Sequence, residues 1–545
     1  MAVLAGWLLA AAFPHPGTPA LAWLAPGLIL MCALGQSGGT AFRIGYIAGL
    51  AHYLASLYWL LFIPFPAGAV AGWLALSAYL SLYPAVWVWL CWRSFPGNLR
   101  ADRSGSGSGD VAGAWGLRQL ADLFFAVAWW QRASWALSCA VIWVALEMTV
   151  SRLLSGFPWN LLGASQYRVT PLIQVASLTG VYGVSFLVAW FSVASAMAGL
   201  RLLHRPALRW ACVNEVALPT LVVTVAVAWG FRQMLRTPAA DRTLSVALIQ
   251  PSIPQKLIWD HREDSNRFSQ LLELSNLALA AQPDLLVWPE AAMPAFTAEN
   301  YRAITNLVGT HRVWMVFGAD DAEHVAGAET ADEYRYYNAA FLFGPDGRYV
   351  ARYRKQRLVI FGEYVPWSRW LPFMKWLTPI GEGFAAGPGP VPFEIESIPC
   401  KLSALICFED VFSDLARRHA RGDIDFLLNL TNDGWFGQTA AHWQHAATAV
   451  FRAVENGLPL VRCTNNGLTC WIDSVGRIRQ VLGTEHRDVY GPGFMTTRIP
   501  LLRSGTRREA TLYREHGDWF GWGCVVLTVA LLALQQTRTR RDMPG

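Results

Sequence analysis

Charged side chains are scarce in this chain, and their scarcity argues against an ordinary soluble protein. Asp, Glu, Lys and Arg make up 15% of the 545 residues, whereas hydrophobic residues make up 54% and Trp occurs 27 times. Soluble domains carry about 25% charged residues. The composition therefore predicts a membrane protein, and the length exceeds that of one ordinary domain.

Patterns that would indicate nucleic acid or metal are also missing. The formal net charge is +6, but the arginines stand beside apolar segments and in short loops, not on a basic face with interleaved aromatic residues. The nine cysteines include no pair of C-x-x-C motifs, and the two histidines of "HWQH" at 442–445 have no evident third ligand. We therefore expect no nucleic-acid partner, no metal and no cofactor, and a structural role for both histidines.

Most of the cysteines can act as small hydrophobes, because five of them lie inside apolar segments: Cys32, Cys91, Cys139, Cys212 and Cys524. The others are Cys400, Cys407, Cys463 and Cys470. Cys463 and Cys470 flank "TNNGLT", a hairpin signal, and could pair across two strands in an oxidising compartment. Two unpaired thiols are the simpler alternative.

Long apolar runs are abundant, and about 20 apolar residues suffice to cross the hydrocarbon core. The first run lacks the basic start of a signal peptide and is followed at once by another run, so we interpret both as membrane spans. Eight spans are predicted, at about 1–13, 19–35, 43–63, 67–92, 121–149, 171–200, 209–231 and 517–536.

Loop charges predict the orientation of these spans. With eight spans, one side receives most of the loop arginines: Arg43, Arg93, Arg100, Arg103, Arg118, Arg201, Arg205, Arg209, Arg538, Arg540 and Arg541. The loops at 14–18 and 64–66 on the other side carry no Lys or Arg, and 150–170 carries only two Arg. The positive-inside rule then places both termini in the cytoplasm and the long stretch before the last span outside. "RSGSGSGD" at 103–110 is predicted to be a flexible cytoplasmic linker.

The polar stretch at about 240–505 predicts an α/β domain. Short apolar runs at 245–250, 284–290, 313–318, 338–343, 403–409 and 425–431 have the length and composition of strands. Helical patterns at 264–281 and 441–456 lie between some of them, and "GPDG" at 344–347 indicates a turn. The predicted order is seven spans in 1–231, the α/β domain in 240–505, the eighth span at 517–536, and a cytoplasmic tail at 537–545.

Three chemically different side chains follow predicted strands. Glu290 ends "DLLVWPE", Lys355 follows "RYVARYR", and Cys407 ends "SALIC". In open α/β sheets such groups gather beyond the carboxyl ends of the strands. A thiol attacks an acyl carbon as thiolate, so Glu290 is the expected base and Lys355 the expected oxyanion partner. Each residue alone also fits a structural role; the three together favour catalysis.

Longer motifs around these residues resemble a known family. "WPE" (288–290), "YRKQRLVIFGEYVP" (353–366) and "CFED" (407–410) resemble the Glu–Lys–Cys signature of the nitrilase superfamily. "LIQPSIPQKLIWD" (248–260), "NDGWFG" (432–437), "RCTNNGLTCWID" (462–473) and "SGFPWNLLGASQ" (155–166) are similar to the apolipoprotein N-acyltransferases of Gram-negative bacteria. These motifs cover both halves of the chain in the family's order.

The resemblance implies an eight-span inner-membrane enzyme with a periplasmic αββα domain. Its reaction moves an acyl chain from a phospholipid, typically phosphatidylethanolamine, to the α-amino group of the S-diacylglyceryl cysteine of an apolipoprotein. By this resemblance the catalytic residues are the nucleophile Cys407, the base Glu290 and the oxyanion partner Lys355. The remaining matches are the supporting acids Glu363 and Glu409 and the substrate-contacting aromatics Trp259, Trp435 and Phe436. A monomer is expected.

The chain departs from the family at three positions, where Pro, Tyr and Ala are common: Ile360, Phe408 and Gly434. None of these is one of the three predicted catalytic residues.

Two other functions remain open from the sequence. One is a membrane-tethered nitrilase or amidase that hydrolyses small C–N substrates, although a tether would need only one span. The other is a lipid-binding or transport protein with an inactive nitrilase-like domain, although such a protein would be expected to lose one of the three residues.

Overall fold

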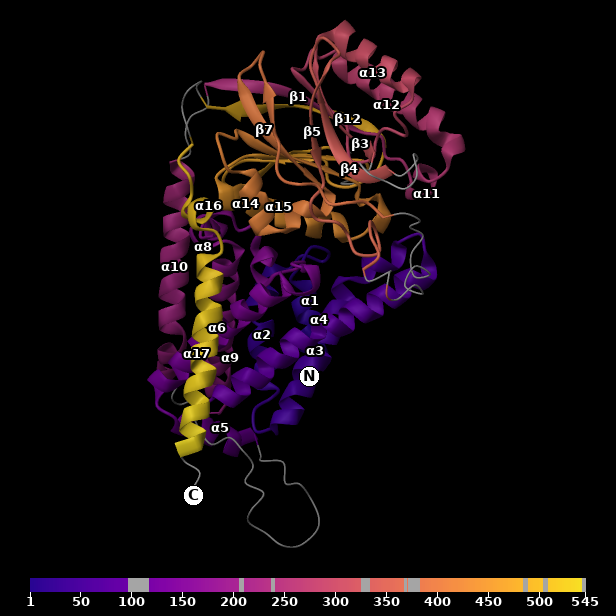
Figure 1. The fold of residues 1–545 in the computed structure, drawn as a ribbon. Helices are drawn as coiled ribbons and strands as arrows, with labels where there is room; N and C mark the ends of the chain where they lie inside the picture. Colours follow the sequence, from indigo (N-terminus) through magenta and orange to yellow (C-terminus); the bar gives the residue numbers. More distant parts are fainter. Residues whose placement is uncertain are drawn as a thin grey trace. The chain divides into compact units, whose positions relative to one another are not determined.

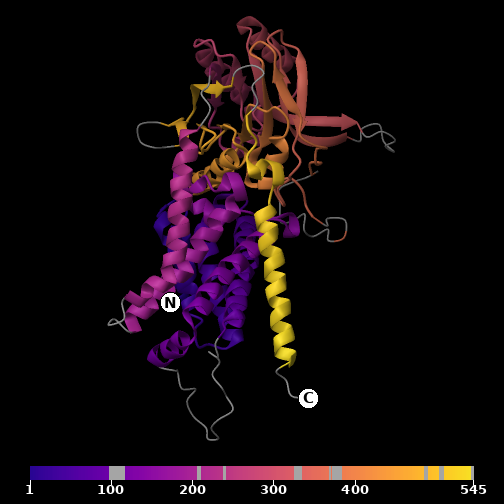
Figure 2. The ribbon, with the colours of Figure 1, turned by 90° about the vertical axis from the view of Figure 1, so that its left-hand side faces the viewer.

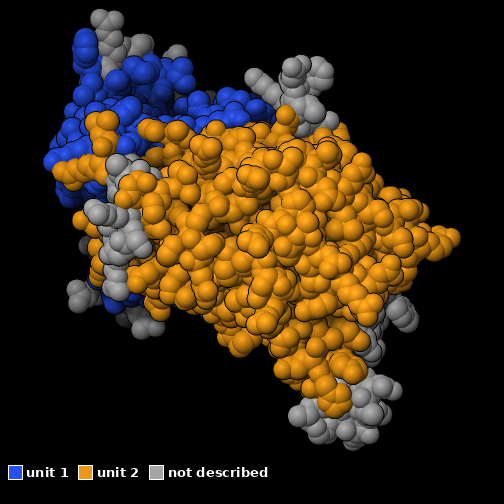
Figure 3. Space-filling model, turned by 90° about the horizontal axis from the view of Figure 1, so that it is seen from above, with its two compact units in different colours: residues 1–58, 73–234, 518–545 blue, residues 59–72, 235–517 orange. Residues whose placement is uncertain are grey.

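The computed structural model describes residues 1–96, 117–204, 210–236, 241–324, 334–366, 370, 383–483, 489–502 and 508–541 (Figure 1). The predicted linker at 103–110 lies outside the described residues. The chain divides into two compact units, coloured separately in Figure 3. The helical unit comprises Met1–Tyr58, Trp73–Met234 and Asp518–Gly545, and the sheet unit comprises Trp59–Gly72 and Leu235–Gly517.

Helices long and apolar enough to cross a membrane make up much of the helical unit. Among the described residues there are five such helices: Pro66–Ser94 (α4), Trp129–Val150 (α6), Val181–His204 (α9), Trp210–Leu235 and Trp519–Thr537. The last two contain α10 (Val213–Leu235) and most of α17 (Trp519–Arg541), which Figure 2 shows as long continuous helices. Their exposed apolar side chains, including Leu221 and Val526, suit a hydrocarbon environment.

The other helices of this unit are shorter or less apolar. They are α1 (Ala2–Ala11), α2 (Ala25–Met31), α3 (Gly38–Ser56), α5 (Leu117–Ala126), α7 (Thr170–Ile173) and α8 (Ala176–Thr179). The predicted span at 171–200 is broken because Gly180 has φ +70° between α8 and α9. The predicted span at 43–63 changes to a 3₁₀ turn, Tyr58–Phe62, after α3. Eight spans therefore stay a prediction.

A buried carboxylate holds the irregular segment after α6. Glu147 accepts hydrogen bonds from the backbone N–H of Leu162 (2.7 Å) and from the indole of Trp143 (2.9 Å). Ser185 of α9 accepts the N–H of Gly163 at 2.8 Å. Backbone groups outside a helix need such partners when water is absent. The polar residues of α6 and α9 thus allow the "GFPWNLLG" segment to be buried.

The sheet unit contains two six-stranded sheets. The first has the strand order β12-β1-β2-β3-β4-β5, and the second has the order β11-β10-β9-β8-β7-β6. In the first sheet, β1 (Arg242–Gln250), β2 (Leu285–Val287) and β3 (Trp314–His324) are parallel. The antiparallel strands are β4 (Tyr334–Phe343), β5 (Tyr349–Arg354) and β12 (Gly493–Leu501).

The second sheet repeats this arrangement. Its parallel strands are β7 (Cys400–Ile406), β8 (Phe426–Thr431) and β9 (Leu460–Thr464), and its antiparallel strands are β6 (Pro392–Ile395), β10 (Cys470–Ile472) and β11 (Ile478–Val481). Parallel strands in both sheets place several strand ends at the same edge. Glu290, Lys355 and Cys407 follow strands that end at this edge.

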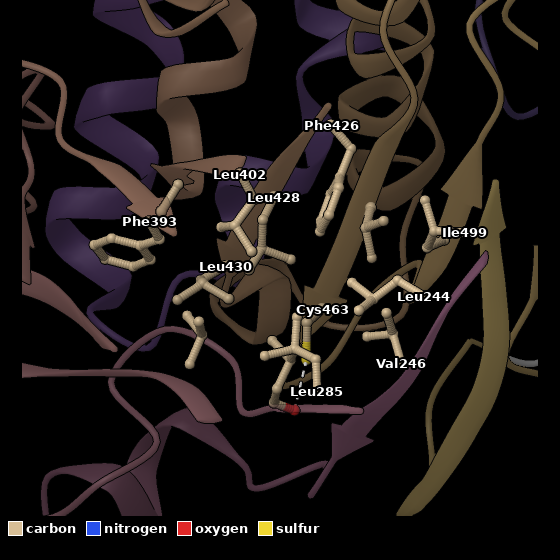
Figure 4. Close-up of a cluster of buried hydrophobic side chains, with 14 of the residues drawn as sticks. Leu244, Val246, Leu285, Phe393, Leu402, Phe426, Leu428, Leu430, Cys463 and Ile499 are labelled. Carbon is tan, nitrogen blue, oxygen red and sulfur yellow. Dashed lines mark hydrogen bonds between the residues drawn. The ribbon is translucent and has the colours of Figure 1, made fainter. Parts of the chain in front are cut away.

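The two sheets pack face to face around one apolar core. One cluster of buried side chains includes Leu244 and Val246 of β1, Leu402 of β7 and Leu428 of β8 (Figure 4). On the outer face of the first sheet, α12 (Asp264–Leu279) and α13 (Ala298–His311) pack in a second cluster. The second sheet carries α14 (Ser413–His419) and α15 (Ala441–Asn456). This αββα arrangement, in a chain that also contains long apolar helices, confirms the predicted fold class.

Short elements complete the sheet unit: α11 (Gln255–Ile258), α16 (Leu512–His516), and the 3₁₀ turns His261–Glu263, Cys407–Val411 and Asp433–Phe436.

Cys463 and Cys470, the possible pair across the predicted hairpin, are both free thiols in the structure. Cys463 donates to the carbonyl oxygens of Ile249 (3.3 Å) and Val287 (3.4 Å) in the other sheet. The simpler of the two cysteine alternatives therefore describes the structure.

A substitution in the inter-sheet core tests this packing. Leu428→Ala leaves a cavity in a fully buried site, so we expect a loss of about 2–5 kcal/mol in the free energy of unfolding. The measurement is thermal unfolding of the purified protein in detergent. Val350→Ala, on a side chain that is 48% exposed, is the control and should leave the midpoint nearly unchanged. Equal midpoints for the two variants would contradict the assigned core.

Candidate active site

The ends of β2, β5 and β7 bring the three predicted catalytic residues to one edge of the sandwich. Glu290 follows β2, Lys355 follows β5, and Cys407 follows β7. The ammonium of Lys355 lies 3.2 Å from Glu290 Oε1 and 2.8 Å from Glu363 Oε1. All three charged side chains are buried. Two carboxylates and one ammonium thus form a compact, desolvated group.

Neutral donors fix the two carboxylates. The Nδ2 of Asn338, in β4, donates to Glu290 Oε1 (2.8 Å) and to Glu363 Oε1 (2.9 Å). The backbone N–H of Asn432 donates to Glu290 Oε2 at 2.9 Å, and that of Val359 donates to Glu363 Oε2 at 2.8 Å. Asn338 was not predicted from the sequence, where its only signal is an amide at the start of the otherwise apolar run "NAAFLF".

Cys407 presents its thiol on a sharply turned backbone. Its φ is +52°, which is uncommon for a residue with a Cβ, and Asn429 Nδ2 holds its carbonyl at 3.0 Å. The Cys407 side chain interacts electrostatically with Glu290 and Lys355 and hydrogen-bonds to the Thr431 hydroxyl. Backbone strain of this kind often marks reactive residues.

Burial raises the pKa of the Cys407 thiol well above its usual value, and Glu290 raises it further against the opposing effect of Lys355. For Lys355, burial alone would lower the pKa, but Glu290 and Glu363 outweigh it and the pKa is raised. The resting thiol is therefore neutral beside a charged ammonium. A neutral thiol would need a base to attack an acyl carbon as thiolate, and Glu290 is close enough to interact with it electrostatically.

Glu409 connects two strand ends and also interacts electrostatically with Lys355. Its carboxylate accepts the N–H of Ile406 (2.8 Å), at the end of β7. It also accepts the N–H of Gln356 (2.7 Å), the N–H of Arg357 (3.0 Å) and the Tyr353 hydroxyl (2.8 Å). Its pKa is raised by burial against these hydrogen bonds. Glu409 thus links the segment that carries Lys355 to the strand that precedes Cys407.

The predicted substrate-contacting aromatics belong to two loops that meet. The rings of Trp259 and Trp435 are 5.2 Å apart, and Trp259 is 42% exposed. Phe436 packs against Trp59 with 4.5 Å between ring centroids, and the Trp59 indole donates to Gln444 at 3.1 Å. These contacts of Trp59 were not predicted from the sequence, because the residue lies inside the predicted span at 43–63.

The three residues that depart from the family pattern, Ile360, Phe408 and Gly434, each fit against residues close to them in the sequence. Ile360 forms a β-bridge with Tyr364, and the Phe408 ring packs on Phe412 at 5.1 Å. A Cβ on Gly434 would lie 2.9 Å from Asn432 Oδ1, so this glycine permits a close approach. Within the described ranges, no group of three or more His, Cys, Asp or Glu could hold a metal ion.

Gly318 offers a test of how Glu290 is placed. A Cβ there would lie 2.6 Å from the Pro289 carbonyl oxygen and 2.7 Å from Glu290 Cα, so Gly318→Ala must displace Glu290. We expect alkylation of Cys407 by iodoacetamide, followed by peptide mass spectrometry, to slow about tenfold or more. Gly309→Ala, at an open position of α13, is the matched control. An unchanged rate for Gly318→Ala would remove Glu290 from thiol activation.

Comparisons with known proteins match both parts of the chain. The model for the apolipoprotein N-acyltransferase N-terminal domain matches residues 5–194, and the carbon-nitrogen hydrolase model matches residues 245–491. Among solved structures, an amidase from Nesterenkonia sp. aligns with a TM-score of 0.35 and 17% identity, over 48% of this chain and 94% of that chain.

Curated relatives align over almost the whole length. The apolipoprotein N-acyltransferase of Geobacter metallireducens is 35% identical over 98% of this chain and 94% of its own. That of Vibrio cholerae is 30% identical over 84% and 83% of the two chains. Both parts are matched in order, and the Geobacter metallireducens relative is covered over 94% of its length, so this chain belongs to the apolipoprotein N-acyltransferase family.

Proposed function

We propose that this enzyme moves an acyl chain from a phospholipid, through a thioester on Cys407, to the α-amino group of the S-diacylglyceryl cysteine of an apolipoprotein. Membership of the family supports the N-acyltransferase activity. The observation that supports the residue roles is the convergence of Glu290, Lys355 and the Cys407 thiol at one edge of the sandwich.

In the first half-reaction, Cys407 Sγ attacks the ester carbonyl of the phospholipid while Glu290 takes the thiol proton. The Lys355 ammonium stabilises the oxyanion of the tetrahedral intermediate, because it is fixed and shielded from water. The C–O bond then breaks and the lysophospholipid alkoxide takes the proton from Glu290. The products are the acyl-thioester and Glu290 as carboxylate.

In the second half-reaction, the neutral α-amine attacks the thioester carbonyl. Glu290 accepts a proton from the attacking nitrogen, and collapse of the intermediate breaks the C–S bond. The proton returns to the sulfur, so the free thiol is restored. Donor and acceptor occupy the site in turn, which predicts ping-pong kinetics.

Water must be kept from the thioester, since its hydrolysis would make the enzyme a phospholipase. The aromatic pair Trp259 and Trp435 is suited to that cover and to contact with acyl chains. Both substrates are lipidated, and their reacting groups lie at head-group level. A catalytic unit joined to membrane-spanning helices can meet both at that level.

The location and finer substrates are part of the same proposal. Eight spans with arginine-rich loops on one side predict an inner-membrane enzyme with cytoplasmic termini. The catalytic domain of 240–505 would then face the periplasm, before a last span at 517–536. Phosphatidylethanolamine is the proposed donor, and a monomer is the proposed state.

Hydrolysis of small C–N compounds is the second candidate, because residues 245–491 match the carbon-nitrogen hydrolase model. Release of ammonia from small amides without lipid would support it. The apolar helices favour lipid substrates instead. A purely lipid-binding role is disfavoured because Glu290, Lys355 and Cys407 are all present and brought together.

An excess of carboxylates around the site suits an amine acceptor. Asp320 in β3 is exposed and pairs with Asn338 across the β3–β4 ladder. It is close enough to Glu290 and Glu363 to interact with them electrostatically. Asp320 therefore adds a third carboxylate near Glu290 and Glu363, and this excess of negative charge attracts cationic groups.

Asp320→Asn tests this attraction. We expect the KM for a diacylglyceryl lipopeptide to rise about two- to fivefold with kcat nearly unchanged, because an exposed charge contributes a modest binding energy. Steady-state N-acylation at low ionic strength is the measurement. Asp346→Asn, in the β4–β5 turn, is the control. A lower kcat without a change in KM would argue against a role in amine recognition.

The thioester itself is tested by mass spectrometry after incubation with a phospholipid of defined chains. We expect an acyl mass increment on the peptide bearing Cys407, and its disappearance in Cys407→Ala together with all N-acylation. Cys32→Ala, at a half-buried thiol of the helical unit, should keep both signals. N-acylation by Cys407→Ala, or an acyl group on another residue, would refute the mechanism.

A further inference from the structure

The "HWQH" motif at the start of α15 has contacts that a merely space-filling role does not require. His442 and His445 lie one turn apart, and both are buried. His445 Nδ1 lies 2.8 Å from Asp433 Oδ1, and His442 Nε2 donates to the Gly437 carbonyl at 2.7 Å. The two rings therefore hold both ends of the loop Asp433–Gly437, which carries Trp435 and Phe436.

His445 is also held from its other side. Its Nε2 lies 2.7 Å from Asp410 Oδ1, and Arg462 of β9 bonds to both Asp410 and Asp433. An imidazole that faces carboxylates at both nitrogens donates from both and is an imidazolium. Two carboxylates then balance one imidazolium and one guanidinium, all buried. We call the side chains of His445, Asp410, Asp433 and Arg462 the His445 network.

The pKa values agree with this charge assignment. Burial alone would lower the pKa of His445, but Asp410 and Asp433 outweigh burial and Arg462, and raise it to about 9. Burial would raise the pKa of Asp433, but His445, His442 and Arg462 hold it well below its usual value. The second histidine, His442, lies 3.9 Å from Asp433 Oδ2.

The His445 network reaches the nucleophile through one hydroxyl. Thr431, the last residue of β8, lies with its Oγ1 3.3 Å from Asp433 Oδ1 and hydrogen-bonds to the Cys407 side chain. Asp410 belongs to the same 3₁₀ turn as Cys407, and Asp433 begins the turn that carries Trp435. The network thus joins the segment of the thiol to the segment of the substrate-contacting aromatics.

We infer that His445 is a positioning residue for acyl transfer. Through Asp433 and Thr431, it fixes the position of the Cys407 thiol relative to the Asp433–Gly437 loop. The inference rests on the proposed function, because it takes Cys407 as the nucleophile. The Thr431 hydroxyl has one proton and two lone pairs. It donates to Asp433 while the thiol is neutral, and rotates to donate to sulfur as negative charge develops there.

Thr431 provides the sharper test, because Val has nearly the shape of Thr without the hydroxyl. The assay uses the full-length enzyme with phosphatidylethanolamine in detergent micelles, and follows acyl-enzyme on Cys407 by rapid quench and mass spectrometry. We expect Thr431→Val to slow the maximal rate about tenfold, the effect of one hydrogen bond to a charged group, without changing the lipid concentration at half-maximal rate. Thr431→Ser should restore the rate to within about threefold of the native enzyme.

The pH profile tests His445. A group whose pKa is raised by folding contributes below its ordinary pKa, and that contribution is lost as pH rises through the folded value. The native rate of acyl-enzyme formation should therefore fall above pH about 9. His445→Gln should be slower at pH 7 and lack that fall, whereas His311→Gln, at an exposed position of α13, should match the native profile.

The outcomes separate the two proposals. No acyl group on Cys407 of the native enzyme would overturn the proposed function and this inference with it. Native acylation with Thr431→Val at the native rate would overturn the positioning role alone. If His445→Gln does not fold, the Val and Ser variants of Thr431 still decide the matter, because they leave the buried charges in place.

Discussion

The ammonium of Lys355, buried between the carboxylates of Glu290 and Glu363, is the interaction on which the active site depends. Each of the three charges would be costly to bury without the others. Asn338 fills the remaining hydrogen-bonding capacity between the two acids without adding charge. Because one ammonium meets two carboxylates, the group keeps a net negative charge. Burial, together with the nearby charge of Glu290, keeps the proton on the resting Cys407 thiol.

Hydrogen bonds hold the segment of Cys407, the proposed nucleophile, from two directions. On one side, Glu409 fastens the end of β7 to the segment that follows β5, so the distance between sulfur and ammonium is set by backbone hydrogen bonds. On the other side, Thr431 and Asp433 connect the thiol to α15. The inter-sheet core needs only apolar contacts, and it fixes the strands whose ends carry these groups. Polar residues at the edge of the sheets thus fix the position of the thiol, and packing of the inter-sheet core fixes the strands that carry those residues.

Sequence reasoning found the parts of this site that follow strands and missed the parts inside them. Glu290, Lys355 and Cys407 stand after apolar runs, where strand ends are expected to gather. The helix at 441–456 was predicted with its exact bounds, because Asn456-Gly457 ends it and Gly457 has φ +64°. Asn338 and Thr431 look like ordinary polar residues of strands, and only their distant partners give them a role. The structural role assigned to His442 and His445 from the sequence did not include their charged partners, since Asp410 and Arg462 come from other elements.

Long-range pairing and breaks in apolar segments were the other obstacles. β12 completes the first sheet beside β1, although more than two hundred residues separate them, and no local pattern encodes that pairing. Within the helical unit, the apolar run at 171–200 reads as one span, but Gly180 divides it. Trp59 reads as part of a span as well, whereas residues 59–72 belong to the sheet unit. The hydrophobicity of a segment predicts that the segment avoids water. It does not predict which neighbouring element the segment packs against.

The protonated state of the resting Cys407 has a consequence for the lifetime of the enzyme. Oxidants convert thiolates to sulfenic and then to irreversible sulfinic acids, and they attack neutral thiols far more slowly. Under the proposed mechanism, the sulfur of Cys407 loses its proton only during attack on the substrate, so it spends little time as the vulnerable thiolate. In an oxidising compartment, this delayed ionisation would preserve the catalyst between turnovers.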